Sequence, residues 1–598
     1  MKVSDYIMNF LYDHGIKDLF LLSGGGMMHL LDAAKRHENL NLVFNLHEQA
    51  SSICAESYAQ FTHNLGACMV TTGPGATNAF TGCAGAWVDS TPVMFISGQC
   101  KTEQMGQLTG LRIYGSQEIA IVPCVKPITK YAVTVLKKEE IRYHMEKSLY
   151  LATHGRKGPV WIDVPLDVQG ANIEVDELQG FDPKKEGYED NPKPTLNEIE
   201  KIYSLLNKAK RPVILAGHGV MASNAQETIR KITEKFNLPA LSTWRAKGIW
   251  GDEEELYMGS CGAPGTRYSN YVVQNCDLLI VVGTRLNPAI TAFDEPHFAP
   301  LAKKVMVDIE KAEMDKLNIE FELKIESDAG EFLNMLLSYE RLYEEKDRTE
   351  WLSYCKRMKE KYPLNKEKQV NGNKDKVDGF AFAEKLSDYS KDTDIFVGSS
   401  SGRTCGISHM AYRLKKGQRF VTSMGLGSMG WCIPSAISCC IAGGKQRTLV
   451  LEGDGSLQHN IQELQLISTY KLPLKIFVFS NKGYASIYTM QRNNFKSRFA
   501  GCNGESGVIL PSMEKIAMLY GLKYSRIAND SEIDRVLREV MKDDSPCLCE
   551  LEADIDFDEI PKSITIANDD GTFTSSKLEY LYPFLSKEEQ ADNMPEWD

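Results

Sequence analysis

Short apolar runs alternate with amphipathic stretches along most of the chain, and this alternation is the main structural signal in the sequence. Because the runs are short and mostly bounded by glycine or polar turns, they read as strands with helices between them. The predicted strands are 18–22, 42–46, 67–70, 93–96 and 160–162, then 212–216, 278–282 and 304–308, and finally 394–397, 419–422, 447–452, 474–480 and 547–551. Strands that alternate with helices favour parallel sheets. We therefore predict the α/β class, with three doubly wound parallel-sheet domains in series.

Two irregular segments separate these three units. Residues 181–194 are charged, rich in proline and glycine and without periodicity, which is typical of a linker. Residues 339–376 begin with a highly charged stretch that has a helical pattern, and the rest of the segment has no periodicity. The expected domains are 1–178, 195–338 and 377–560, followed by a tail at 561–598 that packs on a neighbour or frays.

Composition and charge restrict the possible ligands. The chain of 598 residues is 43% hydrophobic and 25% charged, as in ordinary globular proteins. Its formal net charge of -12 repels polyanions, which argues against nucleic acid as the main partner. No apolar run reaches the ~18 residues that a membrane span needs, and polar residues interrupt the start of the chain, so neither a membrane anchor nor a signal peptide is expected. We expect a cytoplasmic protein that binds small molecules, and its 15 cysteines, which form no CxxC pair, read as reduced thiols.

The clearest chemical signal is a pair of motifs, each at the end of a predicted strand. The motif GDGS at Gly453–Ser456 begins a predicted helix, in which the inward positions are Leu457, Ile461, Leu464 and Ile467. The free N–H groups at a helix N-terminus, with glycines that let the backbone approach closely, form an anion site. Parallel strands end side by side, so Asp454, Asn481 and a free backbone carbonyl can converge on one cation. Because Mg²⁺ prefers oxygen ligands and retains phosphate oxygens, the pair predicts a phosphate and magnesium site, whereas GDG alone also fits an ordinary turn.

This pair of motifs resembles the thiamine diphosphate site of the acetolactate synthase group of enzymes, the acetohydroxyacid synthase large subunits. Four further segments resemble parts of the same family: Asn45–Ala50 before a helix, Val70–Asn78, Gly158–Pro165 and Gly425–Gly430. The resemblance covers almost the whole chain. It implies a pyrimidine-binding, a central and a diphosphate-binding domain, with thiamine diphosphate and Mg²⁺ as cofactors.

The resemblance also implies roles for individual residues. Glu48 corresponds to the carboxyl group that faces the cofactor's pyrimidine nitrogen and promotes its reactive tautomer. Met429 corresponds to the side chain that wedges between the two rings, and the carbonyl group of Gly427 to the acceptor for the amino group. Gln117 is a candidate for holding the reaction intermediate, and His29 for moving a proton or orienting the acceptor, although His29 also fits an ordinary helix face. The other implied cofactor-binding residues are Pro74, Asn78, Gly398, Ser399, Ser400, Gly453, Asp454, Gly455, Ser456, Asn481, Gly483 and Tyr484, among which Asp454, Asn481 and the carbonyl group of Gly483 hold the metal.

Activity and assembly are implied in the same way. The family pattern implies decarboxylation of a 2-oxo acid, pyruvate being the first candidate, and transfer of the acyl anion to a carbonyl acceptor. It also implies a homodimer or homotetramer in which Glu48 of one subunit and Asp454 of another share one cofactor at the interface. Met490, nine positions beyond Asn481, stands where the synthases have an aromatic residue, so we expect a different acceptor, such as a keto sugar attached to a nucleotide. The alternatives are a 2-oxo acid decarboxylase or C–C hydrolase without carboligation, and a cofactor-binding subunit without catalysis.

The sequence does not decide which cofactor the central unit binds. Gly217–Gly219 and Arg285 match the first and last conserved parts of the family's flavin-binding pattern that this chain retains. Asn287–Ala289 stands where that pattern has an acidic pair and a second arginine. A Gly-x-Gly turn after a strand is weak evidence for a nucleotide by itself. The alternatives for this unit are FAD, an adenine nucleotide or no cofactor.

Overall fold

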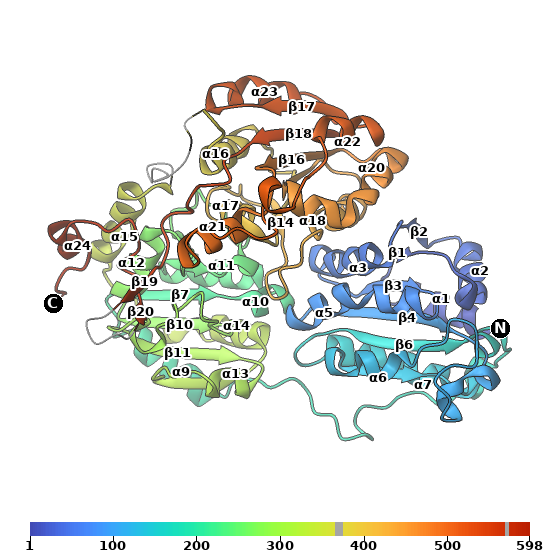
Figure 1. Ribbon diagram of the computed structural model, residues 1–598. Helices are drawn as coiled ribbons and strands as arrows, with labels where there is room; N and C mark the ends of the chain where they lie inside the picture. The colour runs from blue at the N-terminus through green and yellow to red at the C-terminus, as the bar shows by residue number, and fades with distance from the viewer. Residues whose placement is uncertain (365–372, 374, 568–572, 598) are drawn as a thin grey trace.

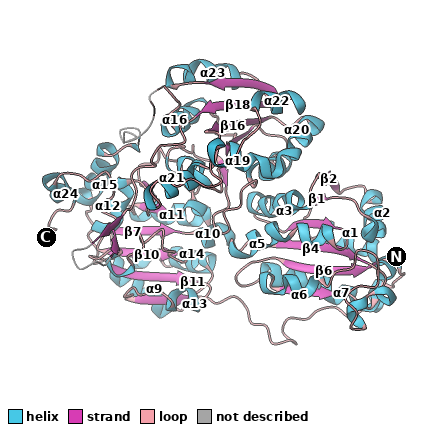
Figure 2. Cartoon of the chain, in the orientation of Figure 1, coloured by secondary structure: helices cyan, strands magenta, loops and turns pink. Residues whose placement is uncertain are grey.

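The computed structural model describes residues 1–364, 373, 375–567 and 573–597. Three six-stranded parallel sheets follow one another along the chain, and each is packed between helices (Figure 1, Figure 2). The prediction of three α/β domains in series is therefore confirmed. Within the described ranges, no helix is long and apolar enough to cross a membrane.

The first sheet has the strand order β2-β1-β3-β4-β6-β5. Its strands are β1 (Asp18–Leu21), β2 (Asn41–Phe44), β3 (Gly66–Val70), β4 (Val93–Gln99), β5 (Tyr131–Thr134) and β6 (Val160–Pro165). Its helices are α1 (Val3–Asp13), α2 (Met28–Arg36), α3 (Glu48–Thr62), α4 (Pro74–Asn78), α5 (Phe80–Val88), α6 (Ile121–Val125), α7 (Ile141–Thr153) and α8 (Leu166–Gly170). The inner strands β3 and β4 are buried along their whole length, as expected for strands between two helix layers.

The second sheet has the order β12-β11-β10-β7-β8-β9, so the direction of strand addition reverses between β7 and β10. Its strands are β7 (Pro212–Ala216), β8 (Ala240–Ser242), β9 (Tyr257–Ser260), β10 (Leu278–Val282), β11 (Lys303–Asp308) and β12 (Leu323–Glu326). Its helices are α9 (Leu196–Leu206), α10 (His218–Ala222), α11 (Gln226–Phe236), α12 (Arg267–Asn275), α13 (Lys311–Asp315), α14 (Ala329–Ser338) and α15 (Thr349–Lys361). Ligands of open parallel sheets bind at such a reversal, outside the carboxyl ends of the strands.

The third sheet has the order β14-β13-β15-β16-β18-β17, which repeats the topology of the first sheet. Its strands are β13 (Ile395–Val397), β14 (Arg419–Val421), β15 (Thr448–Gly453), β16 (Leu474–Ser480), β17 (Lys523–Ile527) and β18 (Cys547–Glu552). Its helices are α16 (Gly379–Tyr389), α17 (Gly402–Met410), α18 (Cys432–Ala442), α19 (Asp454–Leu457), α20 (Leu464–Tyr470), α21 (Ala485–Asn494), α22 (Met513–Leu519) and α23 (Ile533–Val540).

One hydrophobic core joins the first and third domains of the chain. Helices α3 and α18 pack against each other (Figure 1), and Ile53 of α3 shares a buried cluster with Ile437 of α18. Within this contact the hydroxyl groups of Ser57 and Ser438 form a hydrogen bond of 2.8 Å. Because both helices are buried here, the first domain is fixed against the third within a single chain.

Within the three parallel sheets, the apolar runs do not reveal five strands: β5, β8, β9, β12 and β17. Four of these, β5, β9, β12 and β17, are edge strands. An edge strand is covered on fewer sides, so polar residues interrupt its sequence, as in LKIE of β12 and KYSRI of β17. The fifth, β8, is only three residues long.

The prediction of a single helix after the GDGS motif is wrong in one respect, because this segment forms three short helices in the structure. A 3-10 helix, η11 (Gln458–Glu463), separates α19 from α20, and Asn460 within it has non-helical angles (φ -136°, ψ 35°). The side chain of Asn460 donates a hydrogen bond to the carbonyl oxygen of Gly430 (2.8 Å). This bond to another loop competes with regular helix geometry. The predicted inward positions Leu457, Leu464 and Ile467 are nevertheless buried, and Ile461 is half-buried.

The C-terminal tail packs on the middle domain of its own chain. A two-stranded antiparallel sheet of β19 (Thr565–Ala567) and β20 (Phe573–Ser575) leads to α24 (Lys587–Asn593), and the chain ends beside α12 and α15 (Figure 1). Arg267 of α12 donates to the carbonyl oxygen of Leu581 (3.0 Å), and Trp597 packs edge-on against Trp351 of α15. The irregular end of the predicted segment 339–376 lies mostly outside the described residues.

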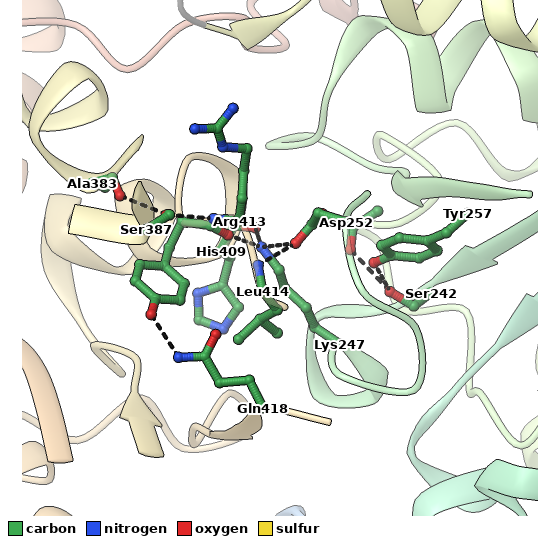
Figure 3. Close-up of polar contacts among 12 residues, drawn as sticks. Ser242, Lys247, Asp252, Tyr257, Ala383, Ser387, His409, Arg413, Leu414 and Gln418 are labelled. Carbon is green, nitrogen blue, oxygen red and sulfur yellow. Dashed lines mark hydrogen bonds and ion pairs between the residues drawn. The ribbon is translucent and has the colours of Figure 1, made fainter. Parts of the chain in front are cut away.

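A buried lysine ties the middle domain to the third domain (Figure 3). Lys247 follows β8 and is 3% exposed, and its Nζ atom donates to the carbonyl oxygens of His409 and Tyr412 (2.7 Å each) at the end of α17. Asp252 lies 3.9 Å from the same ammonium group and accepts a hydrogen bond from the N–H group of Leu414 (2.6 Å). A cation is favourable there because the C-terminal end of a helix is partially negative.

Replacing Lys247 by Met should destabilise the protein, because two buried carbonyl oxygens then lose their donor. At about 1–3 kcal/mol for each of the two buried groups left unsatisfied, the free energy of unfolding should fall by about 2–6 kcal/mol. Urea unfolding followed by tryptophan fluorescence measures this change. The exposed Lys311 provides the matched control, Lys311→Met, which should change the unfolding midpoint little. Equal urea-unfolding midpoints for both variants would contradict a stabilising role of the Lys247 contacts.

Candidate active site

The two predicted motifs lie side by side at the carboxyl ends of β15 and β16. These strands are adjacent and parallel up to Gly453, so Asp454, the first residue of α19, and Asn481, the first residue after β16, follow neighbouring strand ends. The carboxylate of Asp454 accepts hydrogen bonds from the backbone N–H groups of Gly455 (2.8 Å) and Lys482 (2.6 Å). The bond from Lys482 joins the two motifs directly.

Three oxygen atoms at this edge fit a Mg²⁺ ion. Asp454 is almost fully buried, and this burial raises the pKa of its carboxyl group to about 7. The Oδ1 atom of Asn481 is buried and has no hydrogen-bond partner among the described residues. The carbonyl oxygen of Gly483 lies 3.5 Å from the position that a Cβ atom would take at Gly455. A cation would neutralise the carboxylate and satisfy the amide oxygen, so these residues fit the predicted ion.

The ring of Tyr484 packs on the backbone of the GDGS motif. A Cβ atom at Gly455 would lie 2.5 Å from this ring, so glycine is required there. The N–H group of Tyr484 donates to the carbonyl oxygen of Cys502 (2.8 Å), which fixes the start of α21. The structure therefore places Tyr484 with the predicted metal ligands.

The phosphate-side loop and the loop that carries Met429 meet at the same edge. The hydroxyl group of Ser400 donates to the carbonyl oxygen of Ser428 (2.7 Å), and the N–H group of Gly430 donates to the hydroxyl of Ser456 (2.9 Å). These two bonds connect the loop after β13, the Met429 loop and the GDGS motif. The predicted diphosphate-binding segments are thus neighbours in the structure.

Gly398 and Ser399 lead from β13 into α17. The N–H group of Ser399 donates to the hydroxyl of Ser408 (3.1 Å), and its own hydroxyl group bonds to that of Thr404 (2.8 Å). Thr404 in turn lies 3.9 Å from the Cβ position at Gly453. The start of α17 therefore adjoins the GDGS motif.

Glu48 is the first residue of α3 and is 8% exposed. The side-chain amide of Asn78 donates to its Oε2 atom (3.0 Å), and its Oε1 atom lies 3.2 Å from the Cβ position at Gly75. Both neighbours belong to the short helix α4, which begins at Pro74. The predicted pyrimidine-side residues Glu48, Pro74 and Asn78 therefore form one cluster.

The other two candidate catalytic residues, Gln117 and His29, lie in different places in the structure. The backbone of Gln117 abuts Gly73, with its carbonyl oxygen 2.1 Å from the Cβ position there, so Gln117 lies beside the α4 turn. His29 on α2 instead packs against Gly170 of α8, with Nε2 3.0 Å from that Cβ position. The contacts described for His29 connect it to no other site residue. The roles of both residues stay predictions.

Motif reasoning missed a carboxylate that fixes the segment before Glu48. Glu463 of η11, in the third domain, accepts hydrogen bonds from the side chain of Asn45 and the N–H group of Leu46 (3.0 Å each). Burial raises the pKa of Glu463 to about 7. The only signal in the sequence is an acid within the largely apolar stretch IQELQLI, because a buried carboxylate needs partners.

A cavity of ≈ 230 Å³ lies at the strand reversal of the middle sheet. Its walls include Gly219 and Gly283, whose backbones touch, and Arg285 after β10. Arg156 of the first domain and Met424 of the third domain also line it. The cavity is therefore bounded by all three domains.

Comparison with known proteins identifies the family of this chain. Three family profiles match in chain order: thiamine pyrophosphate enzyme, N-terminal TPP binding domain (residues 1–121), central domain (199–336) and C-terminal TPP binding domain (400–551). A probable acetolactate synthase large subunit of Methanocaldococcus jannaschii is 32% identical over 566 residues, which are 93% of this chain and 92% of that relative. The chain belongs to the thiamine pyrophosphate enzyme family.

Other relatives within the thiamine pyrophosphate enzyme family carry similar names. Acetolactate synthase isozyme 1 large subunit of Escherichia coli is 30% identical, with 92% of this chain and 94% of the relative covered. Acetolactate synthase 2 of Nicotiana tabacum is also 30% identical, with 92% and 82% covered. The chain is thus a thiamine diphosphate-dependent enzyme of the acetolactate synthase type.

Proposed function

We propose that the enzyme decarboxylates a 2-oxo acid, pyruvate in the first instance, and transfers the acyl group to a carbonyl acceptor. The observation that carries this proposal is that one chain of the synthase type has both the Glu48–Asn78 pair and the joined Asp454 and Asn481 motifs. Bound thiamine diphosphate supplies the carbon nucleophile for the 2-oxo acid and the electron sink for the loss of CO₂. A non-catalytic subunit would not need this complete set.

The chain's own residues divide the remaining work. We propose that Glu48 exchanges a proton with the pyrimidine ring and that Asn78 orients its carboxyl group. Asp454, Asn481 and the carbonyl group of Gly483 would hold Mg²⁺, and with it the diphosphate. Gly398, Ser399, Ser400, Gly453, Gly455, Ser456 and Tyr484 would line the diphosphate end, and Gly427 and Met429 the space between the rings.

The acceptor site supports a larger acceptor than a second 2-oxo acid. Ile487 and Met490 of α21, the helix that follows Tyr484, are 42% and 40% exposed, so no described side chain fills the space around them completely. Without an aromatic residue at 490, a bulkier or more polar acceptor has room. We propose a ketone such as a keto sugar attached to a nucleotide.

Product analysis tests this function. Purified enzyme with thiamine diphosphate, Mg²⁺ and pyruvate is incubated with a panel of carbonyl compounds, and mass spectrometry should find acyl adducts of the larger ketones. Efficient formation of acetolactate without reaction of the larger ketones would contradict the proposed acceptor. Free aldehyde that accumulates even with every acceptor present would favour a decarboxylase without carboligation.

We also propose that two chains share each active site, in a homodimer or a dimer of dimers. Large apolar side chains stay exposed in the chain segments that carry Glu48, Gln117 and Gly427: Leu46, Leu108, Leu111, Ile113, Tyr114 and Leu426. Contiguous exposed apolar surface commonly marks a protein–protein interface. Leu46 is two residues from Glu48, and Leu426 adjoins Gly427, so such an interface would enclose the candidate site.

A reducing compartment such as the cytoplasm is the proposed location. All 15 cysteines are free thiols, and all except Cys124 are buried. Disulfides are rare in the cytoplasm, where thiols stay reduced.

Removal of divalent metal should inactivate the enzyme reversibly. Asp454 and Asn481 hold the diphosphate only through the ion, so chelation with EDTA followed by gel filtration should release thiamine diphosphate as well. Cofactor content is measured by fluorescence after oxidation to thiochrome, and activity should return when Mg²⁺ and cofactor are added together. Retention of cofactor and full activity after EDTA treatment would contradict the metal site.

The purified enzyme is expected to carry no flavin. A cofactor of the middle domain would bind in the cavity at its strand reversal. Asn287 and Ala289, which replace charged residues of the flavin pattern, line this cavity. An absorbance spectrum of the pure protein gives the answer directly. Stoichiometric flavin bands would contradict this expectation and leave the thiamine diphosphate site unaffected.

A further inference from the structure

The loop that carries Met429 has no regular secondary structure of its own. It runs from Ser423, after β14, to Trp431, before α18. Gly427 (φ +64°) and Gly430 (φ +76°) adopt left-handed conformations that favour glycine. A loop of this kind keeps one conformation only if neighbouring groups fix it.

Asp89, in the first domain, fixes the beginning of this loop. It follows α5 and is 5% exposed. Its carboxylate accepts hydrogen bonds from the hydroxyl of Ser423 (3.0 Å) and from the N–H groups of Met424 (3.2 Å) and Gly425 (2.8 Å). The contact is so close that a Cβ atom at Gly425 would lie 2.6 Å from Asp89 Oδ1.

An arginine of the middle domain holds Asp89 in place. Nη1 of Arg245 lies 3.1 Å from the Asp89 carboxylate and donates to the carbonyl oxygen of the same residue (2.8 Å). Both side chains are buried, so this ion pair is screened little by solvent. All three domains therefore meet at the start of the loop.

Glu56, also in the first domain, fixes the end of the loop. Its carboxylate is fully buried within α3 and accepts a hydrogen bond from Nε1 of Trp431 (2.8 Å) and another from the amide of Gln60 (2.7 Å). Burial, together with the nearby Asp89 carboxylate, raises the pKa of Glu56 to about 7. Trp431 is 2% exposed, so its indole N–H group depends on this partner.

Between these two anchors the contacts of the loop are with its own third domain. Gly425 and Leu426 are exposed, and Met429 is half-buried. The third domain reaches the loop from the other side, through Ser400 at Ser428 and through Ser456 and Asn460 at Gly430. The first domain therefore contributes hydrogen bonds at both ends of the loop.

We propose that Asp89 and Glu56 are positioning residues, which anchor both ends of the loop 423–431 and thereby hold Met429 where it bends the bound cofactor. This inference rests on the proposed function, because it assigns the loop to thiamine diphosphate. The first domain of each chain then has two tasks: it presents Glu48 to a cofactor, and it shapes the cofactor loop of its own third domain.

Four variants test the proposal in the full-length enzyme. Asp89→Asn removes the charge that three loop donors share, and Trp431→Phe removes one N–H group from the other anchor. Glu56→Gln keeps an acceptor oxygen and serves as the conservative variant. Asp163→Asn is the matched control, because Asp163 is an equally buried carboxyl group of the first domain whose partners Ser97, Gln99 and Thr134 all lie in that domain.

Two measurements on each variant separate positioning from stability. The first is the Kd for thiamine diphosphate at saturating Mg²⁺, and the second is the rate of hydrogen–deuterium exchange at C2 of the bound cofactor, followed by NMR after acid quench. Exchange at C2 requires the bent cofactor, so a stability defect alone does not change it in cofactor-saturated protein. We expect Asp89→Asn and Trp431→Phe to slow exchange at least tenfold, and Glu56→Gln and Asp163→Asn to stay within about threefold of the wild type.

The outcomes are distinct. Wild-type exchange rates in cofactor-saturated Asp89→Asn and Trp431→Phe would overturn the proposal and leave the proposed function intact. If Asp89→Asn does not fold, Trp431→Phe alone decides. A wild-type enzyme that binds no thiamine diphosphate would overturn the proposed function and the inference with it.

Discussion

Turnover should be abolished in the variant Glu48→Gln, while thiamine diphosphate and Mg²⁺ still bind. The amide has nearly the shape of the carboxyl group and can still bond to Asn78, but it cannot exchange a proton with the pyrimidine ring. General acid–base groups typically contribute about 10²–10⁴-fold to a rate, so kcat should fall by at least about 100-fold. Steady-state kinetics with pyruvate measures kcat, and calorimetric titration measures cofactor affinity.

The exposed Glu103 of the same domain provides the control for this experiment, because Glu103→Gln changes the same charge outside the site. It should keep wild-type kcat. An active Glu48→Gln enzyme would refute the assigned role of Glu48. Loss of both activity and cofactor binding would instead mean that Glu48 is needed to build the site.

Replacing Asp454 by Asn should remove the metal and, with it, the cofactor. Asp454 is the one carboxylate among the three proposed ligands, and it also accepts the N–H groups that join the two motifs. Changes even to the partners of metal ligands cost about 10–100-fold in affinity, so loss of this ligand should raise the Kd for Mg²⁺ by about 100-fold or more. The Kd for thiamine diphosphate, measured at fixed Mg²⁺, should rise in parallel.

The matched control is Asp544→Asn, at an exposed position of the same domain. It should leave both affinities unchanged. If Asp454→Asn binds Mg²⁺ as tightly as the wild type, the metal lies elsewhere. If only the affinity for Mg²⁺ falls, the ion does not hold the diphosphate.

Apart from the three-residue β8, the inner strands of the three sheets are predictable from the sequence because burial on both faces demands continuous apolar runs. Strands such as β7, β10 and β16 match their predicted ranges residue for residue. The edge strands β12 and β17 are not predictable in this way, since solvent accepts their polar residues. The break at Asn460 is equally hidden, because it depends on a bond to Gly430, thirty residues away.

In the candidate site, too, residues in local motifs are predictable from the sequence, whereas residues that act through distant contacts are not. Asp454 and Asn481 are predictable because each follows an apolar strand in a short motif, and the parallel sheet brings the strand ends together. Asp89, Glu56 and Glu463 act across domains, through contacts that span hundreds of residues. Only their acidic character within apolar stretches signals that they need partners, and it does not say which.

The central claim is that one cofactor site combines Glu48 of one chain with Asp454 of another. Mixing the inactive variants Glu48→Gln and Asp454→Asn, after dissociation and reassembly, tests it most directly. In random dimers, half of the molecules are mixed and each has one intact site, so activity should return to about one quarter of the wild-type value. If the mixture stays as inactive as its two components, although mass spectrometry shows mixed dimers, the shared site is contradicted.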